Sequence, residues 1–403
     1  YIKNTMDENF LLFEKYPEYV FNFTGSRRYK MMKEYYPERY QKVKEYIDKG
    51  RWHISGSSVE EGEVNASSSE SIIRQVLYGN NFFQREFGKE SHDYMLPDCF
   101  GFIGSVPSVW NHCGLLGFST QKLKSGAAID LPFNVGVWNG PDGKGVIASL
   151  IGTSYTRGVE EDLNKSDLFN ERIESNLEKS GYAFDYVYYG IGDKGGAPRE
   201  NDIRNAVKSA KSSDGKFKVV LTSTDQMYRD ILPEIRESLP EYSGDLLLTQ
   251  HSAGSLTSQA FLKRMNRKNE NLAQSAEQMA SVASSLMQTE YPQSKLNSSW
   301  ELVLGSQMHD ILPGTSILSA NNYAYNDEFI AENGFSETLK NALSTISSQL
   351  NTRVEGRAVA VYNPVAEERE DVVTGELEYS TLPENIKVLN SKGKEVPSQI
   401  LSK

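Results

Sequence analysis

The chain has few of the residues that cross-link small secreted proteins or build common metalloprotease sites. Its 403 residues include only two cysteines, Cys99 and Cys113, which are too few for a disulfide framework. We therefore expect both to be free, buried thiols. None of its five histidines stands in the HExxH or HxxxH spacing of zinc metalloproteases. The sequence also has no GxSxG nucleophile motif and no Walker A motif.

Long hydrophobic runs and basic patches are absent as well. No apolar run approaches the roughly 20 residues that a membrane span needs. The net charge is −11, which argues against nucleic acid as a partner. With 31 glycines and 14 prolines, the composition is that of a folded protein. We expect about two or three domains, no membrane partner and no nucleic-acid partner.

The first half of the chain alternates predicted strands and helices, an order typical of a parallel α/β sheet or barrel. The predicted helices cover residues 6–20 (ending at Pro17), 38–49, 69–87 and 107–116; the predicted strands cover 19–23, 51–56, 94–96, 146–151, 187–189 and 219–222. Catalytic groups of barrels lie in loops after the strands. The loops of interest are therefore 97–98, 189–198 and 222–226.

The second half of the chain changes character twice. Residues 258–288 predict a long helix, and 300–308 and 325–350 predict two more, which together favour a helical bundle. From residue 357 onward, β-strand patterns with turns follow at 358–362 and 372–379. About 45 residues make a poor β domain alone. We therefore expect this segment to begin a larger β domain.

Four places carry candidate chemistry, and each also has a structural explanation. Asp98 follows a predicted strand and is either a nucleophile or metal ligand, or a helix cap. Asp193 lies in a glycine-rich loop that is either a ligand-contacting loop or a flexible turn. His309 and Asp310 end a predicted helix, as a metal ligand with its helper or as a favourable helix end. Trp138 precedes the predicted hairpin turn 141–143 and either stacks on a sugar or packs inward.

Short motifs in a fixed order connect these places along nearly the whole chain. They are Gly50-Arg51-Trp52 with Gly56, Glu61, Asn65 and Glu70; Leu77-Tyr78-Gly79 and Phe87-Gly88; Pro97-Asp98-Cys99-Phe100-Gly101, Pro107 and Thr120-Gln121-Lys122; Trp138, Gly140 and Asp142-Gly143; Thr257-Ser258-Gln259, Lys263-Arg264 and Glu270; Gln307, His309-Asp310 and Gly314; and Tyr362-Asn363-Pro364. In this order they resemble glycoside hydrolase family 38, the α-mannosidases. The composition points to a bacterial member.

The resemblance implies a multidomain α and β fold. It places a (β/α)7-type barrel at residues 1–250, a three-helix bundle at 251–352 and the start of a β-sandwich domain at 353–403. It implies a retaining exo-α-mannosidase that hydrolyses terminal α-mannosides of glycans with one bound Zn²⁺. A homo-oligomer is left open, as is a periplasmic or cytoplasmic location.

The resemblance also assigns roles. Asp98 would be the nucleophile and a zinc ligand, His309 a second zinc ligand, and Asp193 the general acid/base. The implied substrate-binding residues are Phe100, Lys122, Trp138 and Asp310. A retaining glycosidase needs its two carboxyl groups about 5–5.5 Å apart. No dinucleotide or other organic cofactor is implied.

The chain departs from the family pattern in three ways. The family takes two further zinc ligands from a His-x-Asp motif, which this sequence lacks. We expect that motif and the first barrel strand to lie upstream of Tyr1, in a chain incomplete at both ends. Val59 and Glu63 stand where the family often has Trp and Asp. The alternatives are an inactive carbohydrate-binding or structural member, or a metal-dependent hydrolase of another α-glycoside.

Overall fold

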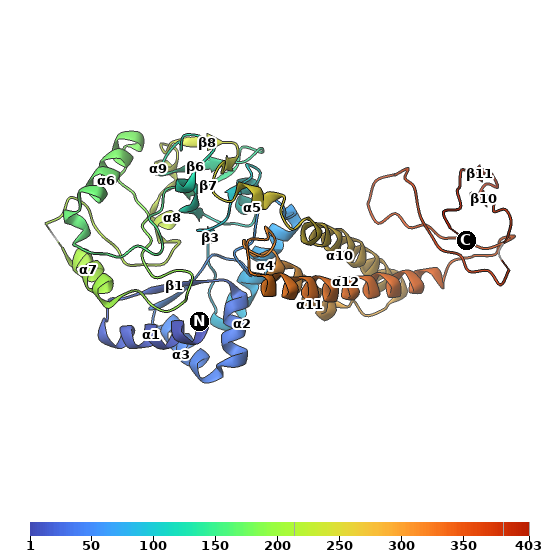
Figure 1. Ribbon diagram of the computed structural model, residues 1–403, viewed down its shortest axis with the longest axis horizontal. Coiled ribbons are helices and arrows are strands. Elements are labelled where there is room, and N and C mark those ends of the chain that lie inside the picture. The colour runs from blue at the N-terminus through green and yellow to red at the C-terminus, as the bar shows by residue number, and fades with distance from the viewer. Residues whose placement is uncertain (213, 382, 403) are drawn as a thin grey trace. The chain divides into compact units, whose positions relative to one another are not determined.

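The computed structural model describes residues 1–403 except 213, 382 and 403 (Figure 1). Its contacts divide the chain into two compact units, Tyr1–Asn351 and Thr352–Lys403. Among the described residues, no helix combines the length and the apolar character needed to cross a bilayer. Each unit is described separately below.

The first unit begins with helices on the outside of short central strands (Figure 1). In chain order its elements are α1 (Ile2–Lys15), β1 (Phe21–Thr24), α2 (Ser26–Tyr35), α3 (Pro37–Asp48), β2 (Trp52–Ser55), α4 (Ser69–Phe87), β3 (Asp93–Met95), β4 (Gly101–Phe102), α5 (Val106–His112), β5 (Gly117–Ser119), η1 (Lys122–Ser125), β6 (Val135–Asn139), β7 (Gly145–Ser149), η2 (Leu163–Lys165), α6 (Asp167–Ser180), α7 (Glu200–Lys211), α8 (Gln226–Asp230), α9 (Pro233–Arg236), β8 (Glu241–Ser243), β9 (Leu246–Leu247) and η3 (Ala253–Leu256).

The described strands of this unit form three sheets. β1 pairs with β2 in parallel, and β4 pairs with β9 antiparallel. The largest sheet has the order β3-β5-β7-β6-β8, in which only β6 and β7 run antiparallel. The β6–β7 hairpin confirms the turn predicted at 141–143, where Gly143 has a φ of 75°.

Two predicted strands, 187–189 and 219–222, do not form. Polar side chains bind their backbone groups where a neighbouring strand would otherwise do so. Thr153 Oγ1 donates to the Tyr188 carbonyl at 2.6 Å, and Asn22 Nδ2 donates to the Thr222 carbonyl at 2.9 Å. The sequence pattern therefore did not predict how the backbone of these two segments bonds.

The N-terminal helices also differ from the prediction. α1 ends at Lys15, earlier than expected, and the Arg51 guanidinium takes over the carbonyl oxygens that follow the helix, at Tyr16 and Tyr19 (2.5 and 2.6 Å). Helix α2 was not predicted. It begins after Gly25 without a side-chain cap, so the polar N-cap that usually marks a helix start is missing.

An aromatic core joins α1, β1 and β2. Trp52 of β2 is fully buried, and the rings of Phe10, Phe13, Phe21 and Phe23 lie 4.9–6.4 Å from it. Centroid distances and tilted geometries of this kind add to the burial energy of each ring. Many of the aromatic residues therefore build the interior and do not face a ligand.

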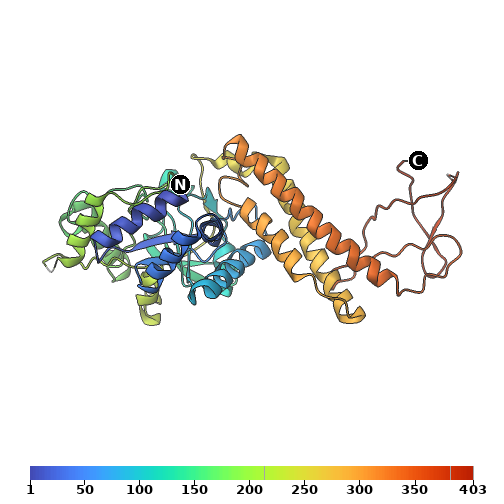
Figure 2. The ribbon, with the colours of Figure 1, turned by 90° about the horizontal axis from the view of Figure 1, so that it is seen from below.

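Three long helices follow the sheets: α10 (Ala260–Met287), α11 (Gln293–Ser306) and α12 (Leu318–Ser347). They lie side by side in Figure 2 and bury a common apolar core that includes Ala273, Trp300 and Phe335. The helix predicted at 258–288 is confirmed. The other two begin at Gln293 and Leu318, seven residues earlier than predicted in each case.

The second unit is extended chain with a single described ladder. β10 (Val388–Leu389) pairs with β11 (Glu395–Val396) antiparallel. The strands predicted at 358–362 and 372–379 are wrong, since these residues form no ladder. Apolar side chains there, such as Val361 and Val372, are 63% and 92% exposed. A segment with no second apolar surface to pack against has little free energy to gain from strand pairing.

A buried carboxyl between α10 and α12 makes the stability of the first unit depend on pH. Glu328 is fully buried, and Asn269 Nδ2 donates to its Oε2 at 2.6 Å while Oε1 has no partner. Burial raises the pKa of Glu328 from 4.5 to about 8. The unfolded chain therefore releases this proton at lower pH than the folded chain does.

We predict that the free energy of unfolding falls as pH rises from about 4.5 to about 8, by an amount on the order of 5 kcal/mol. Glu328→Gln should remove most of this slope, because the amide does not titrate. The exposed Glu337→Gln serves as the control. Urea unfolding followed by circular dichroism at several pH values measures the slope, and an unchanged slope in Glu328→Gln would contradict the prediction.

Candidate active site

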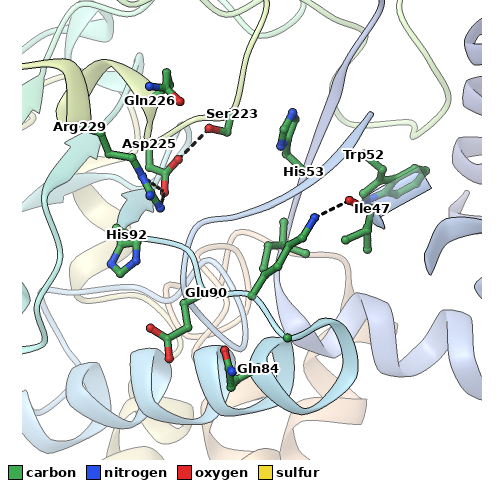
Figure 3. A pocket seen from close by; sticks show the side chains of 13 residues that line it. Ile47, Trp52, His53, Gln84, Glu90, His92, Ser223, Asp225, Gln226 and Arg229 are labelled. Atoms are coloured by element: carbon green, nitrogen blue, oxygen red, sulfur yellow. Dashed lines mark hydrogen bonds and ion pairs between the residues drawn. The ribbon is translucent and has the colours of Figure 1, made fainter. Parts of the chain in front are cut away.

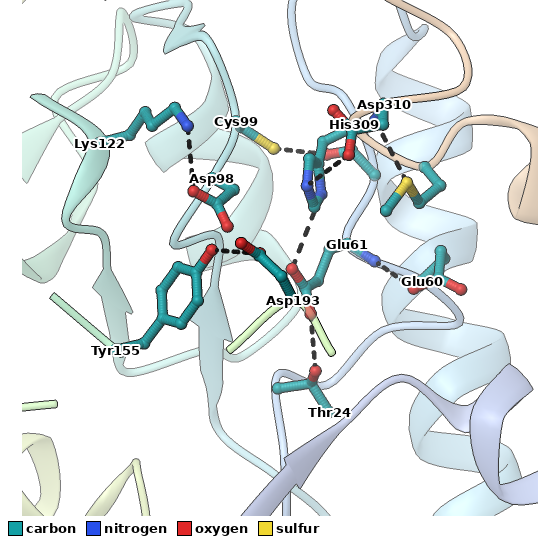
Figure 4. Close-up of polar contacts among 12 residues, drawn as sticks. Thr24, Glu60, Glu61, Asp98, Cys99, Lys122, Tyr155, Asp193, His309 and Asp310 are labelled. Carbon is teal, nitrogen blue, oxygen red and sulfur yellow. Dashed lines mark hydrogen bonds and ion pairs between the residues drawn. The ribbon is translucent and has the colours of Figure 1, made fainter. Parts of the chain in front are cut away.

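A cavity of about 1170 Å³ is lined by β1, by residues of the segments 183–198 and 216–230, and by the loops after β2, β3 and α11. Five polar side chains that line it are shown in Figure 4, and we call them the cavity cluster: Glu61, Asp98, Tyr155, Asp193 and His309. They come from five separate segments of the chain. The structure therefore brings together the predicted Asp98, Asp193 and His309, with Asp310 beside them on the same wall.

Asp98 lies just after β3, in the position that the strand pattern predicted. The preceding Leu96 is buried, and its N–H donates to the Ser119 carbonyl at 3.0 Å, which ties this turn to β5. The Asp98 carboxylate accepts from Lys122 Nζ at 3.0 Å and from Gln121 Nε2 at 3.4 Å. These two contacts orient one carboxylate oxygen, Oδ1, and the other oxygen points toward Tyr155 and Asp193 (Figure 4).

Asp193 enters the same cavity on a strained loop. Its own φ is 33°, a left-handed value that residues other than glycine seldom adopt, and Gly190, Gly192, Gly195 and Gly196 around it also have positive φ. The Tyr155 hydroxyl donates to Asp193 Oδ1 at 2.7 Å. The glycines therefore let the backbone make the turn that carries this carboxylate into the cavity.

Tyr155 connects the two predicted catalytic carboxylates. Its hydroxyl lies next to both Asp98 and Asp193 in Figure 4. Burial and the hydrogen bonds with Asp98 and Asp193 raise the pKa of Tyr155 above its usual value. The phenol thus stays protonated at neutral pH and can act as a hydrogen-bond donor between the two acids.

His309 reaches the cavity from the segment after α11. Its backbone N–H donates to the Glu61 carbonyl at 3.0 Å, and its ring is 7% exposed. Nδ1 lies 3.7 Å from the Glu61 carboxylate and Nε2 lies 3.7 Å from Asp310. Nδ1 has no hydrogen-bond partner although it is buried. An unpaired buried nitrogen is a group that a ligand could satisfy.

Sequence analysis did not assign three residues that shape the cavity. Glu61 Oε1 accepts from Thr24 Oγ1 at 2.9 Å and from Arg28 Nη1 at 3.2 Å. Arg28 also pairs with Glu60 at 2.6 Å. The rule that led to Asp98, a carboxylate after a strand, applies equally to Glu61 after β2. Arg28 lies in α2, a helix that was not predicted. The sequence around Tyr155 contains no motif that indicates a functional residue.

Of two aromatic residues predicted to contact substrate, Trp138 lies inside the core, whereas Phe100 lies beside Lys122 and His309. Trp138 is fully buried, and its indole N–H donates to the Gly244 carbonyl at 2.9 Å. The structure does not support a sugar contact by Trp138, because no face of the ring is free. Phe100 is 5% exposed, with its ring centroid 5.2 Å from Lys122 Nζ and 6.4 Å from the His309 ring.

The two cysteines are free, as expected. Cys99 is fully buried next to Asp98, and its Sγ lies 3.6 Å from the Gly62 carbonyl. Burial raises the pKa of the Cys99 thiol. It is therefore a poor nucleophile, since the thiolate is the reactive form. Cys113 is only half-buried, so the expectation of burial is wrong for that residue.

A second cavity, of about 560 Å³, lies between β2, the end of α4 and α8 (Figure 3). Its polar lining includes His53, His92 and the ion pair of Asp225 with Arg229 at 2.6 Å. Burial, together with Lys89, lowers the pKa of His53, so its imidazole is neutral at neutral pH. None of the predicted site residues lines this cavity, and we do not include it in the candidate active site.

The residues that the structure describes do not complete a metal site. No three of their His, Cys, Asp or Glu side chains gather closely enough to hold a metal ion. Asp98 and His309 offer the oxygen and nitrogen donors that zinc accepts, and His309 Nδ1 is unpartnered. Zinc sites use three or four protein ligands. These two residues therefore supply at most part of a zinc shell.

Comparison with known proteins identifies the relatives of this chain. The family described as Glycosyl hydrolases family 38 N-terminal domain matches residues 1–245, and Alpha mannosidase middle domain matches 250–346. Alpha-mannosidase 2C1 of Homo sapiens is 32% identical over 309 residues, which cover 76% of this chain and 29% of that protein. Alpha-mannosidase G of Dictyostelium discoideum is also 32% identical over 309 residues, covering 76% of this chain and 28% of that protein.

A crystal structure of an α-mannosidase from Enterococcus faecalis V583 shares the fold. It superposes with a TM-score of 0.70 at 19% identity, over 87% of this chain and 40% of that chain. The chain spans less than a third of the length of the two curated relatives.

The ion pairs of Arg28 give a stability prediction for the cavity wall. We expect Arg28→Met to lower the free energy of unfolding by about 3–5 kcal/mol, because it leaves the largely buried carboxylates of Glu60 and Glu61 without their cation. Arg39→Met is the matched control, since Arg39 pairs with Asp7 at 2.7 Å on the surface and should cost less than about 1 kcal/mol. Urea unfolding monitored by tryptophan fluorescence measures both, and equal losses would refute the prediction.

Proposed function

The chain belongs to glycosyl hydrolase family 38, and we propose that it carries the two catalytic carboxyl groups of an enzyme that hydrolyses terminal α-mannosides. Its multidomain α/β fold is that of the family. One observation in the structure carries the assignment of residues. Asp98 and Asp193, which are far apart in sequence, meet at the Tyr155 hydroxyl in one cavity (Figure 4).

The proposed reaction is a double displacement with retention at the anomeric carbon. In the first step Asp98 attacks the anomeric carbon while Asp193 gives its proton to the glycosidic oxygen, so the glycosidic bond breaks and the aglycone leaves. In the second step Asp193 takes a proton from water, which attacks the mannosyl ester and frees Asp98. Mannose is released as the α anomer.

Neighbouring side chains have supporting roles in this proposal. Lys122 holds Asp98 Oδ1, which leaves the other oxygen for attack. Tyr155 donates to Asp193 and keeps the acid beside the nucleophile. Phe100, Lys122, Asp310 and the newly identified Glu61 are the proposed sugar contacts. A carboxylate such as Asp310 accepts hydrogen bonds from sugar hydroxyls.

We also propose the finer architecture that the sequence indicated. The strands and surrounding helices of residues 1–250 are assigned to a (β/α)7-type barrel, 251–352 to a three-helix bundle and 353–403 to the start of a β-sandwich domain. The packing of α10, α11 and α12 on one another supports the second assignment. The change of contacts after Asn351 supports the last boundary.

We propose a zinc ion as a substrate-binding group and assign it no step of the reaction. When bound, such an ion would hold sugar hydroxyls and stabilise negative charge. Asp98 and His309 are the proposed ligands among the described residues, and at least one further ligand must join them. The proposed reaction above relies on the side chains of the chain alone.

The main test is the activity of Asp98→Ala in the protein expressed from its natural gene. We expect hydrolysis of 4-nitrophenyl α-mannoside to fall by about 10⁴-fold or more, as for the loss of other covalent nucleophiles. Asp214→Ala, which removes an exposed carboxylate that accepts a hydrogen bond from Ser212 Oγ, should leave the rate unchanged.

Three results would point elsewhere. Full activity in Asp98→Ala would refute the nucleophile. Initial release of β-mannose, detected by proton NMR, would refute the double displacement. Binding of α-mannosides without turnover by the parent protein would favour the inactive carbohydrate-binding alternative, and turnover of α-galactosides in their place would favour the hydrolase of another glycoside.

Zinc binding has its own measurement. We expect zinc titration against a chromophoric chelator to show weaker binding by His309→Ala than by the parent chain, because a nitrogen donor is lost. His112→Ala is the control, since that imidazole is 63% exposed beside Asp142, away from the cavity. Equal zinc affinity in His309→Ala and the parent would rule out His309 as a ligand.

A further inference from the structure

The loop that carries Asp193 is held on its far side by helix α1. Three consecutive polar groups of the loop bond to it. The Gly196 N–H donates to Thr5 Oγ1 at 2.9 Å, and the Ala197 N–H donates to Glu8 Oε2 at 2.9 Å. The Gly196 carbonyl accepts from Asn9 Nδ2 at 3.3 Å. Residues 5, 8 and 9 share one face of a helix, so a single face of α1 holds the loop.

Two of the three side chains that hold the loop, Thr5 and Asn9, are buried, whereas Glu8 is exposed. Asn9 is fully buried, and Thr5 is 3% exposed. Asn9 Nδ2 also donates to the Thr5 carbonyl at 2.7 Å, while its Oδ1 accepts from the Tyr19 hydroxyl at 2.7 Å. The Tyr19 bond sets which end of the Asn9 amide faces the loop. In a buried site such a bond is costly to lose, because the remaining partner has no water to replace it.

The loop lies so close to α1 that a side chain at Gly195 or Gly196 would displace the side chain of Thr5 or Glu8. A Cβ at Gly196 would lie 2.7 Å from Glu8 Oε2, and one at Gly195 would lie 3.0 Å from Thr5 Oγ1. Both glycines also have positive φ. Asp193 precedes this contact by only three residues and has a strained backbone itself. A strained residue persists only when its surroundings hold it in place.

We propose that Thr5, Glu8 and Asn9 of α1 are positioning residues that hold Asp193 at the distance and angle for proton transfer. The inference rests on the proposed function of Asp193 as general acid/base. None of the three side chains touches the reacting atoms. Their role is to hold the backbone at 196–197, which restricts Asp193 to its position beside Tyr155.

The role predicts a particular kinetic signature. A misplaced general acid lowers the rate of hydrolysis of substrates with a poor leaving group. A dinitrophenolate leaves with little protonation, so its substrate is hydrolysed at nearly the parent rate. Displacement of a catalytic group by about 1 Å can cost about 10²-fold in rate. Loss of overall stability would instead lower the amount of active enzyme and reduce the rates on both substrates equally.

Thr5→Val tests the proposal with almost no change of shape. We expect kcat/KM for methyl α-mannoside to fall by about 10-fold or more, and that for 2,4-dinitrophenyl α-mannoside to change by less than about twofold. In Thr5→Val, azide should raise kcat for 2,4-dinitrophenyl α-mannoside, because azide attacks the mannosyl ester in the second step without needing a base. Thr5→Ser, which keeps the hydroxyl, should restore the parent ratio.

Two controls separate this inference from the proposed function. Met6→Ala removes a buried side chain of α1 that does not bond to the loop, and it should leave the ratio of the two substrates unchanged. Asp193→Ala shows the full signature of a lost acid. Hydrogen exchange of the 196–197 amides reports the loop itself, and we expect faster exchange in Thr5→Val than in Met6→Ala.

The results for Asp193→Ala and Thr5→Val together distinguish a wrong positioning role from a wrong general acid. If Asp193→Ala shows the leaving-group signature but Thr5→Val lowers both rates equally or changes neither, the positioning role is wrong and the proposed function stands. If Asp193→Ala lacks the signature, the proposed acid is wrong, and the positioning role falls with it. Unchanged amide exchange at 196–197 in Thr5→Val would overturn the claim that α1 holds the loop.

Discussion

The burial of Trp52 is the interaction on which the N-terminal part of the molecule depends. Its ring contacts side chains from α1 and β1, and its indole N–H donates to the Tyr29 hydroxyl at 2.9 Å, which adds α2. Two helices, α1 and α2, and the strand β1 therefore pack against this one side chain. Those same elements carry Thr5 and Asn9, which hold the Asp193 loop, and Thr24 and Arg28, which hold Glu61. A substitution that disturbs this core would therefore displace both the Asp193 loop and Glu61.

The other half of the cavity depends on backbone pairing between distant segments. Gly62 and Met308 form an antiparallel bridge, and the Glu63 N–H donates to the Gln307 carbonyl at 2.7 Å. Gln307 Nε2 then donates to Asn266 Oδ1 at 2.9 Å and to Ser71 Oγ at 3.0 Å. His309 thus owes its place to α4, α10 and the loop after β2 together. The candidate site is a junction of segments and belongs to no single element.

The sequence predicted the parts of the fold that have a strong period. Helix α4, with apolar side chains such as Ile72 and Val76 on one face, begins and ends where expected. The turn at Gly143 was equally clear, because its residues favour one backbone shape. Helix α2 has no polar cap, and the segments at 187–189 and 219–222 bond through side chains from elsewhere in the chain. Such contacts depend on tertiary structure and leave no local pattern.

The candidate site was predictable to a similar degree. Asp98 and His309 were identified from motif order and Asp193 from its glycine-rich loop. The structure places all three on one cavity, while their chemical roles stay predictions. Trp138 was assigned to the same site from its motif, but it packs inward. Local sequence does not distinguish a tryptophan beside a turn that faces solvent from one that fills a core. Tyr155 was missed because its importance comes only from the two carboxylates around it.

The bridge between Gly62 and Met308 has a consequence for synthesis of the chain. Gly62 leaves the ribosome about 246 residues before its bridge partner Met308 does. Until then Glu61 and Glu63 lack the backbone bonds that hold them, although Trp52 and the aromatic core around it can already pack. The cavity wall therefore cannot be completed until the chain has been made as far as His309, which includes α10 and α11.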